Sequence, residues 1–337
     1  MKPTVGFFVQ TKDHDIVKRN EFYKIDIKIL EDLGFNVQIC HSYKNLPSDV
    51  AFYFIWWWTY AIFPVIKAKR LRKKSMITGT FNLARHIPGA DYYSRPFYQK
   101  FLIKISARLT NMNIMVSKYE LKKMKEDITN TNVSYSPHVL DIDSYKITKK
   151  LKRDKNIFTV AWMGNKNARR KCIPEIIRTA AILKDRGINI PFLIAGKIED
   201  DAFFLKKLVD ELGVSDLVSF LGPIDEKTKL ELFNTCGVYL QPTLFEGFGV
   251  AIAEALLCGA PVITSDVGAV NEITNGNCTY VDSKNPEEIA DQVLNVFDNY
   301  ELYLDIAIKG SEFIKENYYF DRRKKDFEKI LQDLELL

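Results

Sequence analysis

Cysteine and histidine are scarce in this sequence, and their spacing excludes the common disulfide and zinc frameworks. The 337 residues contain five cysteines and four histidines, and no two cysteines form a CxxC pair. Scattered cysteines of this kind are typical of reduced thiols in a cytosolic protein. The GxGxxG, P-loop and HExxH patterns are also absent. We expect no metal, no other cofactor and no nucleic acid as a partner.

Long apolar runs are missing as well. The first run, residues 5–9, is too short for a secretory signal and is expected to be the opening β-strand. Residues 50–66 carry no charge, and their seventeen residues are the lower bound for a membrane-spanning helix. A membrane-spanning helix is disfavoured by Thr59, by Pro64 and by the need for this segment in a central sheet. We therefore expect a cytoplasmic protein.

What the sequence does have is enough apolar surface for two packed domains. Hydrophobic residues make up 47% and charged residues 27%, which suits a globular protein. The length is sufficient for two domains of roughly 150 residues each. Strand-like and helix-like segments alternate in both halves, which is typical of βαβ units and a parallel sheet. We predict an α/β protein with two doubly wound domains that bind ligands at the carboxyl ends of their strands.

The boundary between the domains is expected in a polar, lysine-rich stretch, residues 145–155, that breaks this alternation. We assign residues 1–148 to an N-terminal domain and residues 149–318 to a C-terminal domain. The tail, residues 319–337, is predicted to be a helix with one apolar stripe, which consists of Phe327, Ile330, Leu331, Leu334 and Leu337.

The segment 242–263 carries the chemistry. Its sequence predicts a loop, then a short helix rich in small residues, then a strand. Gly247 and Gly249 allow the backbone to approach a ligand closely. The helix that begins near Val250 directs free N–H groups and the positive end of its dipole to the same place. This pattern predicts an anion site that suits a diphosphate.

Two carboxylates, Glu246 and Glu254, flank this site, although they would repel a phosphate at close range. The conflict disappears if each carboxylate accepts hydrogen bonds from sugar hydroxyls, one pair on a ribose and one on a hexose, with the phosphates between them. A nucleotide-diphosphate sugar has this arrangement. The alternative is that the two glycines serve a turn and that Glu254 only solvates a helix.

At these residues the sequence resembles glycosyltransferase family 4, whose E-x7-E element is matched by Glu246 and Glu254. The likeness covers roughly residues 110 to 320 and is strongest after residue 155. It implies the GT-B fold, in which two Rossmann-like doubly wound parallel-sheet domains face each other across a cleft. The N-terminal domain would then bind the acceptor and the C-terminal domain the nucleotide sugar. A retaining reaction and a tail helix that crosses back to the N-terminal domain are implied as well.

The resemblance also implies roles for single residues. Glu254 would bind the ribose, and Glu246 would hold the transferred sugar together with the backbone amides that follow it. Leu221 and Gly222 would lie beside the base. The full set implied in donor binding, besides the two glutamates, is Gly247, Phe248, Gly249, Val250, Leu221, Gly222, Gly164 and Asn165.

In this family a basic pair after the first strand of the C-terminal domain clamps the diphosphate. Lys171 aligns with the family lysine, whereas Asn165 stands where the family usually has an arginine. Arg170 or Arg169 could reach the same oxygens, because residues 166–171 include four cations. Stabilising the leaving diphosphate is the largest electrostatic task in such a reaction. The alternative is a solvated basic loop.

The N-terminal half departs further from the family, which often has a glycine-rich first loop and a histidine in the acceptor domain. His86 is the nearest histidine and is a candidate catalytic residue, the other interpretation being a structural or surface histidine. Two Asp-x-Asp triplets, residues 13–15 and 141–143, are weak metal motifs. With lysines and a helix dipole on the diphosphate, no divalent ion is required.

Positive charge is concentrated in residues 51–110, which hold eleven lysines and arginines, one acid and fourteen aromatic residues. Tyrosine and tryptophan favour the headgroup depth of a membrane, and lysine and arginine favour anionic lipid. We therefore expect this range to bind the inner face of the cytoplasmic membrane as a peripheral surface. The alternative is that the aromatic residues within 53–58 fill the core and the lysines solvate helices.

Together these features predict a hexosyltransferase that moves a hexose from a UDP- or GDP-sugar to a glycan or lipid-linked acceptor, in the synthesis of cell-surface polysaccharide or glycolipid. The acceptor hydroxyl would lose its proton to the leaving phosphate or to an unidentified base. The alternative is a non-catalytic GT-B partner subunit that tethers a second transferase to the membrane. An epimerase or a phosphorylase of the same fold is a third interpretation, with less support.

Overall fold

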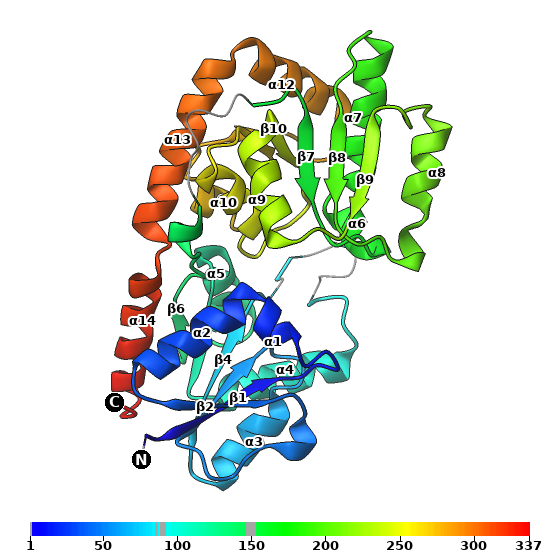
Figure 1. Cartoon of the computed structure of the whole chain (residues 1–337). Coiled ribbons are helices and arrows are strands. Elements are labelled where there is room, and N and C mark those ends of the chain that lie inside the picture. Colours follow the sequence, from blue (N-terminus) through cyan, green and yellow to red (C-terminus); the bar gives the residue numbers. More distant parts are fainter. Residues whose placement is uncertain (1, 82, 85–86, 88–91, 146–152) are drawn as a thin grey trace. The chain divides into compact units, whose positions relative to one another are not determined.

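The structure, a computed structural model, describes residues 2–81, 83–84, 87, 92–145 and 153–337. It divides into two compact units (Figure 1). Unit 1 comprises the described residues of Met1–Arg85 and Asp91–Asp141 together with Tyr318–Leu337, and unit 2 is formed by those of His86–Ala90 and Ile142–Asn317. The predicted boundary at residues 148 and 149 lies outside the described residues.

Unit 1 is built on a parallel sheet of six strands in the order β2-β1-β3-β4-β5-β6. The strands are β1 (Thr4–Val9), β2 (Asn36–Cys40), β3 (Phe52–Trp56), β4 (Lys74–Gly79), β5 (Met112–Met115) and β6 (Val133–Tyr135). All five residues of β3 are buried, because helices cover both faces of the sheet and leave no solvent side for polar residues.

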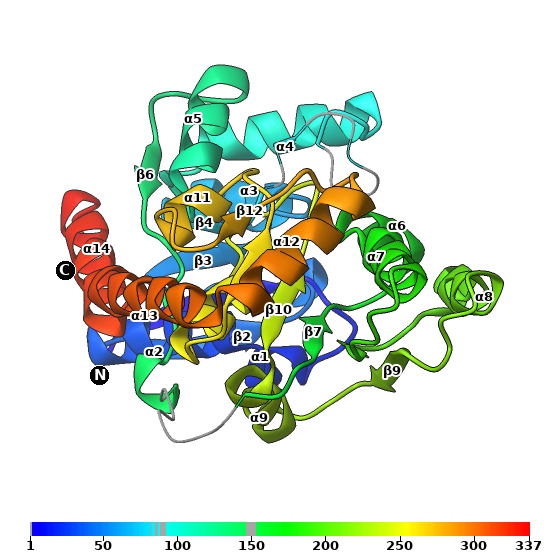
Figure 2. The same cartoon turned by 90° about the horizontal axis from the view of Figure 1, so that it is seen from above.

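Helices pack on both faces of this sheet, and the side chains of β3 alternate between the two cores. Phe54 and Trp56 pack with α2 and α14, whereas Tyr53 and Ile55 pack with α3, α4 and α5. Figure 2 shows α4 and α5 on one side of β3 and β4, with α2 on the other. The helices of unit 1 are α1 (Ile16–Arg19), α2 (Glu21–Asp32), η1 (Tyr43–Asn45), α3 (Ile62–Arg70), α4 (Phe97–Leu109), α5 (Lys118–Asp127) and α14 (Phe320–Asp333).

This packing corrects part of the membrane prediction. Trp56 and Trp58 are 1% and 2% exposed, so most of the aromatic run at 53–58 belongs to the core, as in the alternative interpretation. Among the described residues of the range, the exposed large hydrophobic side chains are Trp57, Tyr60, Phe63, Ile66, Leu71, Phe97, Tyr98, Phe101, Leu102 and Leu109. Among the helices that the structure describes, none combines the length and the apolar character needed to cross a bilayer.

The C-terminal helix α14 is held in unit 1 by a buried ion pair. The Arg323 guanidinium donates to both carboxylate oxygens of Asp26 on α2, at 2.7 and 3.1 Å, and to the carbonyl oxygens of Ser136 and Pro137 at 2.6 and 2.8 Å. Both charged side chains are 1% exposed. Burial raises the pKa of Asp26, and the arginine charge opposes that rise. Each charge in this pair therefore needs the other.

Unit 2 contains a second six-stranded parallel sheet, in the order β12-β11-β10-β7-β8-β9. Its strands are β7 (Ile157–Val160), β8 (Phe192–Ala195), β9 (Val218–Gly222), β10 (Val238–Gln241), β11 (Val262–Thr264) and β12 (Thr279–Tyr280). The order reverses between β7 and β10, because the chain builds the sheet outward from β7 in one direction and then returns to continue from β10 in the other. In doubly wound sheets this switch point is where ligands bind.

The helices of unit 2 cover both faces of its sheet. They are η2 (Ile142–Ser144), α6 (Asn165–Arg170), α7 (Ile173–Asp185), η3 (Asp200–Ala202), α8 (Phe204–Glu211), α9 (Glu226–Thr235), α10 (Val250–Leu257), α11 (Val270–Thr274), α12 (Pro286–Asp298) and α13 (Tyr300–Asn317). The predicted fold class, with two Rossmann-like doubly wound parallel sheets, is confirmed.

The buried pair of unit 1 predicts a large and specific loss of stability. We expect Arg323→Ala to lower the free energy of unfolding by roughly 3–5 kcal/mol, because it leaves the Asp26 carboxylate buried without its partner. Urea unfolding followed by circular dichroism measures the loss. The double variant Asp26→Leu/Arg323→Met should recover much of it, since it removes both charges.

Lys324→Ala is the matched control, because Lys324 pairs with Asp32 at 3.4 Å with both side chains about one-third exposed. Exposed pairs of this kind contribute about 0–1 kcal/mol. Equal losses in Arg323→Ala and Lys324→Ala would show that the buried pair has no special weight.

Candidate functional site

The candidate site lies at the carboxyl edge of the unit 2 sheet, at the switch point between β7 and β10. Two segments meet there. One follows β7 and contains α6 and the start of α7, and the other follows β10 and leads into α10. Parallel neighbours end at the same edge of a sheet, so the loops that leave β7 and β10 are adjacent although about eighty residues separate them.

Two glycines shape the segment that follows β10. Gly249 has a φ of +96° and precedes the first residue of α10, with no side chain capping the helix. Gly268 has a φ of +58°, and a Cβ there would lie 2.2 Å from the backbone oxygen of Glu246. The next amide, that of Ala269, donates to this same oxygen at 2.9 Å. Only glycine allows this close approach, which fixes the backbone of the Glu246 loop.

The Glu246 carboxylate is buried among three donors. Its Oε1 accepts from the Lys171 ammonium, from the Arg170 guanidinium at 3.3 Å and from the Gln241 amide at 3.1 Å. The Gln241 side chain is itself oriented by the Tyr239 hydroxyl, which donates to its Oε1 at 2.6 Å. Arg170 also donates to the backbone oxygen of Phe245 at 2.5 Å. These contacts join the segment after β7 to the segment after β10.

The charges of this cluster stabilise one another. Burial would raise the pKa of the Glu246 carboxyl, but the Lys171 and Arg170 charges outweigh burial and hold this pKa below its usual range. Burial lowers the pKa of Lys171, and Glu246 opposes that effect. With Glu246 ionised, two cations face one carboxylate, and the cluster keeps a net positive charge at the edge of the sheet.

The second carboxylate, Glu254, lies on α10 and has a different environment. Its Oε1 accepts from the Tyr145 hydroxyl at 2.8 Å and from the Lys229 ammonium at 2.9 Å. Lys229, on α9, also pairs with Glu226 at 2.8 Å. Burial raises the pKa of Glu254, and Lys229 and Tyr145 only partly offset this rise. A carboxyl group with a raised pKa at the edge of a sheet is typical of a functional site.

The structure brings most of the predicted site residues to this edge. Glu246, Lys171 and Arg170 are in contact, and Gly247, Phe248, Gly249 and Val250 form the turn into α10. Leu221 and Gly222 end β9, three strands along the same edge from β10. Gly164 is the residue before α6, and the amide of Asn165 donates to Asp201 at 2.9 Å. His86 lies outside the described residues, so its predicted catalytic role stays a prediction.

The basic segment differs from the expected loop. Residues Asn165–Arg170 form helix α6, and this helix turns Arg169 and Arg170 in different directions. Arg170 faces Glu246, whereas the Arg169 guanidinium lies over the Phe204 ring, 4.6 Å from its centroid, and donates to the Asn165 side chain. Of the two arginines proposed for the diphosphate, the structure places only Arg170 beside Glu246.

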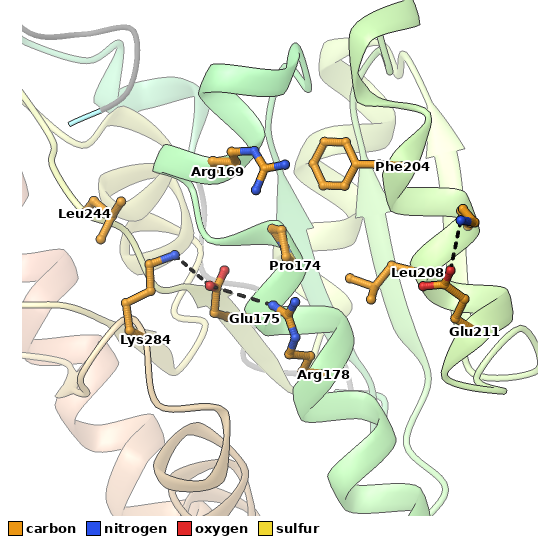
Figure 3. A pocket seen from close by; sticks show the side chains of 10 residues that line it. Arg169, Pro174, Glu175, Arg178, Phe204, Leu208, Glu211, Leu244 and Lys284 are labelled. Carbon is orange, nitrogen blue, oxygen red and sulfur yellow. Dashed lines mark hydrogen bonds and ion pairs between the residues drawn. The ribbon is translucent and has the colours of Figure 1, made fainter. Parts of the chain in front are cut away.

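Arg169 instead lines a separate hollow of about 600 Å³ between α6, α7 and α8 (Figure 3). Lys284 Nζ lies 2.6 Å from Glu175 Oε1, and Arg178 lies 3.8 Å from the same oxygen. Neither Glu246 nor Glu254 lines this hollow. Its cations are partly engaged by its own carboxylate.

Three side chains of the site were not singled out from the sequence: Tyr145, Lys229 and Gln241. Tyr145 is 109 residues from Glu254 along the chain, and it stands in the polar stretch taken for a linker. Lys229 stands on an ordinary amphipathic helix. Of the three, Gln241 could have been identified from the sequence, because it is a polar residue at the buried end of a strand that leads into the motif.

The described residues contain no group of three or more histidine, cysteine, aspartate or glutamate side chains that could hold a metal ion. In the first Asp-x-Asp triplet, Asp13 forms an ion pair with Arg19. The expectation that the reaction needs no metal stays a prediction.

A family model described as "Glycosyl transferases group 1" matches residues 143–313 of the chain. An uncharacterized glycosyltransferase of Methanocaldococcus jannaschii is 32% identical over 158 residues, which are 46% of this chain and 40% of the relative. A D-inositol 3-phosphate glycosyltransferase of Mycolicibacterium smegmatis is 34% identical over 133 residues, 37% of this chain and 30% of the relative. The chain thus matches less than half of the length of these curated relatives.

Solved structures resemble the chain over nearly its whole length. Sucrose-phosphate synthase from Thermosynechococcus elongatus has a TM-score of 0.80 at 14% identity, with 99% of each chain covered. Anabaena HepE, solved in complex with UDP and glucose, has a TM-score of 0.78 at 14% identity and covers 98% of this chain and 100% of its own. At these identities the likeness shows the fold.

The close approach at Gly268 predicts how strongly the Glu246 loop is fixed. We expect Gly268→Ala to lower the free energy of unfolding by about 1–3 kcal/mol more than Gly276→Ala does, because only the first adds a clash with the Glu246 backbone. Gly276 has a φ of +77° and no atom within 4 Å of an added Cβ, so its variant carries the backbone strain alone. Urea unfolding of both variants measures the difference. Equal losses of unfolding free energy in the two variants would show that the Glu246 loop shifts to accommodate the added Cβ without a measurable cost.

Proposed function

Because the chain belongs to the glycosyl transferases group 1 family, we propose that it is a retaining hexosyltransferase of glycosyltransferase family 4. Its donor is a nucleotide-diphosphate sugar with UDP or GDP as the nucleotide, and its acceptor is a glycan or a lipid-linked sugar. The observation that carries the proposal is the pair of buried carboxylates, Glu246 and Glu254, on either side of the turn into α10, each held by its own cation.

In this proposal the two glutamates bind the two sugars of the donor. Glu254 accepts from the ribose hydroxyls, and Glu246, together with the amides of the turn from Gly247 to Gly249, holds the hexose. A carboxylate can accept about four hydrogen bonds, so the bonds from Tyr145 and Lys229 to one oxygen of Glu254 leave room for a hydroxyl pair. Leu221 and Gly222 line the place of the base.

The diphosphate lies between the two carboxylates, against the start of α10 and the Lys171–Arg170 pair. The net positive charge of the Glu246 cluster offsets the repulsion between the Glu246 carboxylate and a phosphate. The two cations exceed the single carboxylate they surround, and the positive end of the α10 dipole adds to them. As the bond to the leaving diphosphate breaks, Lys171 and Arg170 stabilise the charge that develops on it.

The transfer breaks the bond between the anomeric carbon and the diphosphate oxygen and forms a bond from that carbon to the acceptor oxygen. The acceptor proton goes to the leaving diphosphate or to a base that is not yet identified. No covalent protein nucleophile and no metal are part of the proposal. Unit 1 binds the acceptor, and His86 is kept as its candidate catalytic histidine. Orientation and charge stabilisation supply the rate enhancement.

The named relatives support the donor and acceptor classes. HepE was solved with UDP and with UDP-glucose. A Campylobacter jejuni relative, 24% identical over 169 residues, is named for transfer of N-acetylgalactosamine to a diphospho-undecaprenol acceptor. A Staphylococcus aureus relative, 26% identical over 190 residues, is named for capsular polysaccharide biosynthesis. We further propose that the protein lies at the inner face of the cytoplasmic membrane, bound through exposed residues of the range 51–110, and acts in the synthesis of cell-surface polysaccharide or glycolipid.

A panel of UDP-, GDP- and ADP-sugars tests the donor. We expect one of them to bind and to be hydrolysed slowly, and we expect Glu254→Ala to weaken its binding about 10- to 100-fold, which is the effect of losing a charged hydrogen-bond acceptor. Isothermal titration measures binding, and nucleotide release measures hydrolysis.

Glu231→Ala is the control for this experiment, because Glu231 is an exposed glutamate on the same helix as Lys229. It should bind the donor like the wild type. If no donor binds the wild type, the proposal is wrong. The non-catalytic partner subunit, which the substitution of Asn165 for the family arginine favours, then becomes the better hypothesis.

The raised pKa of Glu254 predicts a pH dependence of donor affinity. The ribose hydroxyls need the ionised carboxylate, so affinity should fall as the pH is lowered through this pKa, at a higher pH than an ordinary glutamate would give. Lys229→Gln should move the midpoint to still higher pH, because the lysine charge opposes the rise. Glu254→Gln should bind weakly at every pH and lose this step. Titrations from pH 4.5 to 8 would contradict the prediction if wild type and Glu254→Gln showed the same profile.

A further inference from the structure

Helix α4 of unit 1 presents an aromatic and apolar face to solvent. Phe97 is 81% exposed, Phe101 62% and Tyr98 53%, and Leu102 and Leu109 are exposed as well. At 100° per residue these side chains share one side of the helix, and Ile103, Ser106 and Ala107 bury the opposite side against the sheet. An exposed apolar strip of this kind marks an interaction surface.

The cations of α4 border the same face. Lys104 and Arg108 lie one helical turn apart, close to Phe97 and Phe101 around the helix, and Lys100 flanks them. The sequence of α4, FYQKFLIKISARL, contains no acidic residue. The neighbouring helix α3, which packs against α4, has basic residues in its last turn. Lys100 and Arg108 each donate to a backbone oxygen, at 3.2 and 3.3 Å, which uses one of their several N–H groups. Aromatic rings beside cations therefore characterise α4.

We propose that α4 is the element that docks unit 1 on an anionic bilayer surface. The aromatic rings enter the headgroup region, and Lys100, Lys104 and Arg108 lie against lipid phosphates. The helix has 13 residues and is about 20 Å long, so it lies in the interface and does not cross the membrane. A second copy of the chain is a poorer occupant, because a symmetric contact through α4 would bring the two sets of cations together.

The position of α4 connects this surface to the proposed function, on which this part of the inference rests. The chain leaves β4 at the carboxyl edge of the sheet, and α4 runs back to the start of β5. The first turn of α4, with Phe97 and Tyr98, therefore lies toward the edge where doubly wound sheets bind ligands. Docking through this turn brings the acceptor edge of unit 1 to the membrane, where a lipid-linked acceptor would be held.

Flotation of the full-length protein with vesicles tests the docking surface. We expect binding to vesicles of phosphatidylcholine with 30% phosphatidylglycerol, weak binding to phosphatidylcholine alone, and loss of binding at high salt. Phe97→Ser/Phe101→Ser should lower the partition constant for anionic vesicles at least tenfold. Lys104→Gln/Arg108→Gln should lower it severalfold and reduce its salt dependence. Phe203→Ser is the matched control, because Phe203 is an exposed phenylalanine of unit 2 at 52%, and it should bind like the wild type.

Two results would overturn the inference. One is the absence of wild-type binding to anionic vesicles, and the other is equal loss in Phe203→Ser and in Phe97→Ser/Phe101→Ser. Sedimentation velocity tests whether a second copy of the chain binds α4 instead of a membrane. A wild-type dimer that dissociates in Phe97→Ser/Phe101→Ser would make α4 a self-association surface. Donor binding in solution separates this inference from the proposed function. Phe97→Ser/Phe101→Ser should keep its donor binding. A wild type that docks on vesicles but binds no donor would refute the proposed transferase function and not the docking surface.

Discussion

Unit 2 depends on a carboxylate that is buried together with the cations that neutralise it. Glu246 could not remain ionised in the interior alone, because the cost of removing a charge from water is several kcal/mol. Lys171 and Arg170 remove that cost, and in doing so they tie the segment after β7 to the segment after β10. Gln241 donates to the same carboxylate, and the backbone contact at Gly268 holds the Glu246 loop in addition.

The two glutamates of the motif show how environment assigns different properties to the same residue type. Both are buried, and burial raises the pKa of both. Glu246 has two cations close to its carboxylate, and its pKa falls below the usual range. Glu254 has one cation, which Glu226 also engages, together with a neutral hydroxyl, and its pKa stays raised. The first therefore keeps its charge firmly, and the second is the more responsive to what binds beside it.

The membrane surface shows the same dependence on packing. A count of aromatic residues and cations in residues 51–110 identified the right range but not the right side chains. The run at 53–58 lies in a central strand of a sheet covered on both faces, so the hydrophobic effect buries it. Helix α4 lies on the outside of that layer, and only its far side remains in water with Phe97 and Phe101 on it. Burial, which composition does not report, decides which aromatic rings are available to a lipid surface.

The fold class and the centre of the site follow from local patterns in the sequence. Alternating strands and helices predict parallel sheets, because a helical crossover returns the chain so that the next strand runs in the same direction. Gly247, Gly249, Glu246 and Glu254 lie within nine residues, so local spacing places them together without knowledge of the fold. Gly268 fixes the same loop, but its role depends on a contact with a backbone oxygen twenty-two residues away.

The distant groups that complete the site depend on how the elements of unit 2 pack together. Tyr145, which precedes β7, and Lys229, on the helix before β10, reach Glu254 although neither segment carries a motif, because the packing of unit 2 brings them together. The tertiary structure also separated Arg169 from Arg170. Neighbouring residues of a helix point about 100° apart, and the helix α6 replaces the loop expected from charge alone. Distances between segments are set by packing, which residue spacing along one chain does not encode.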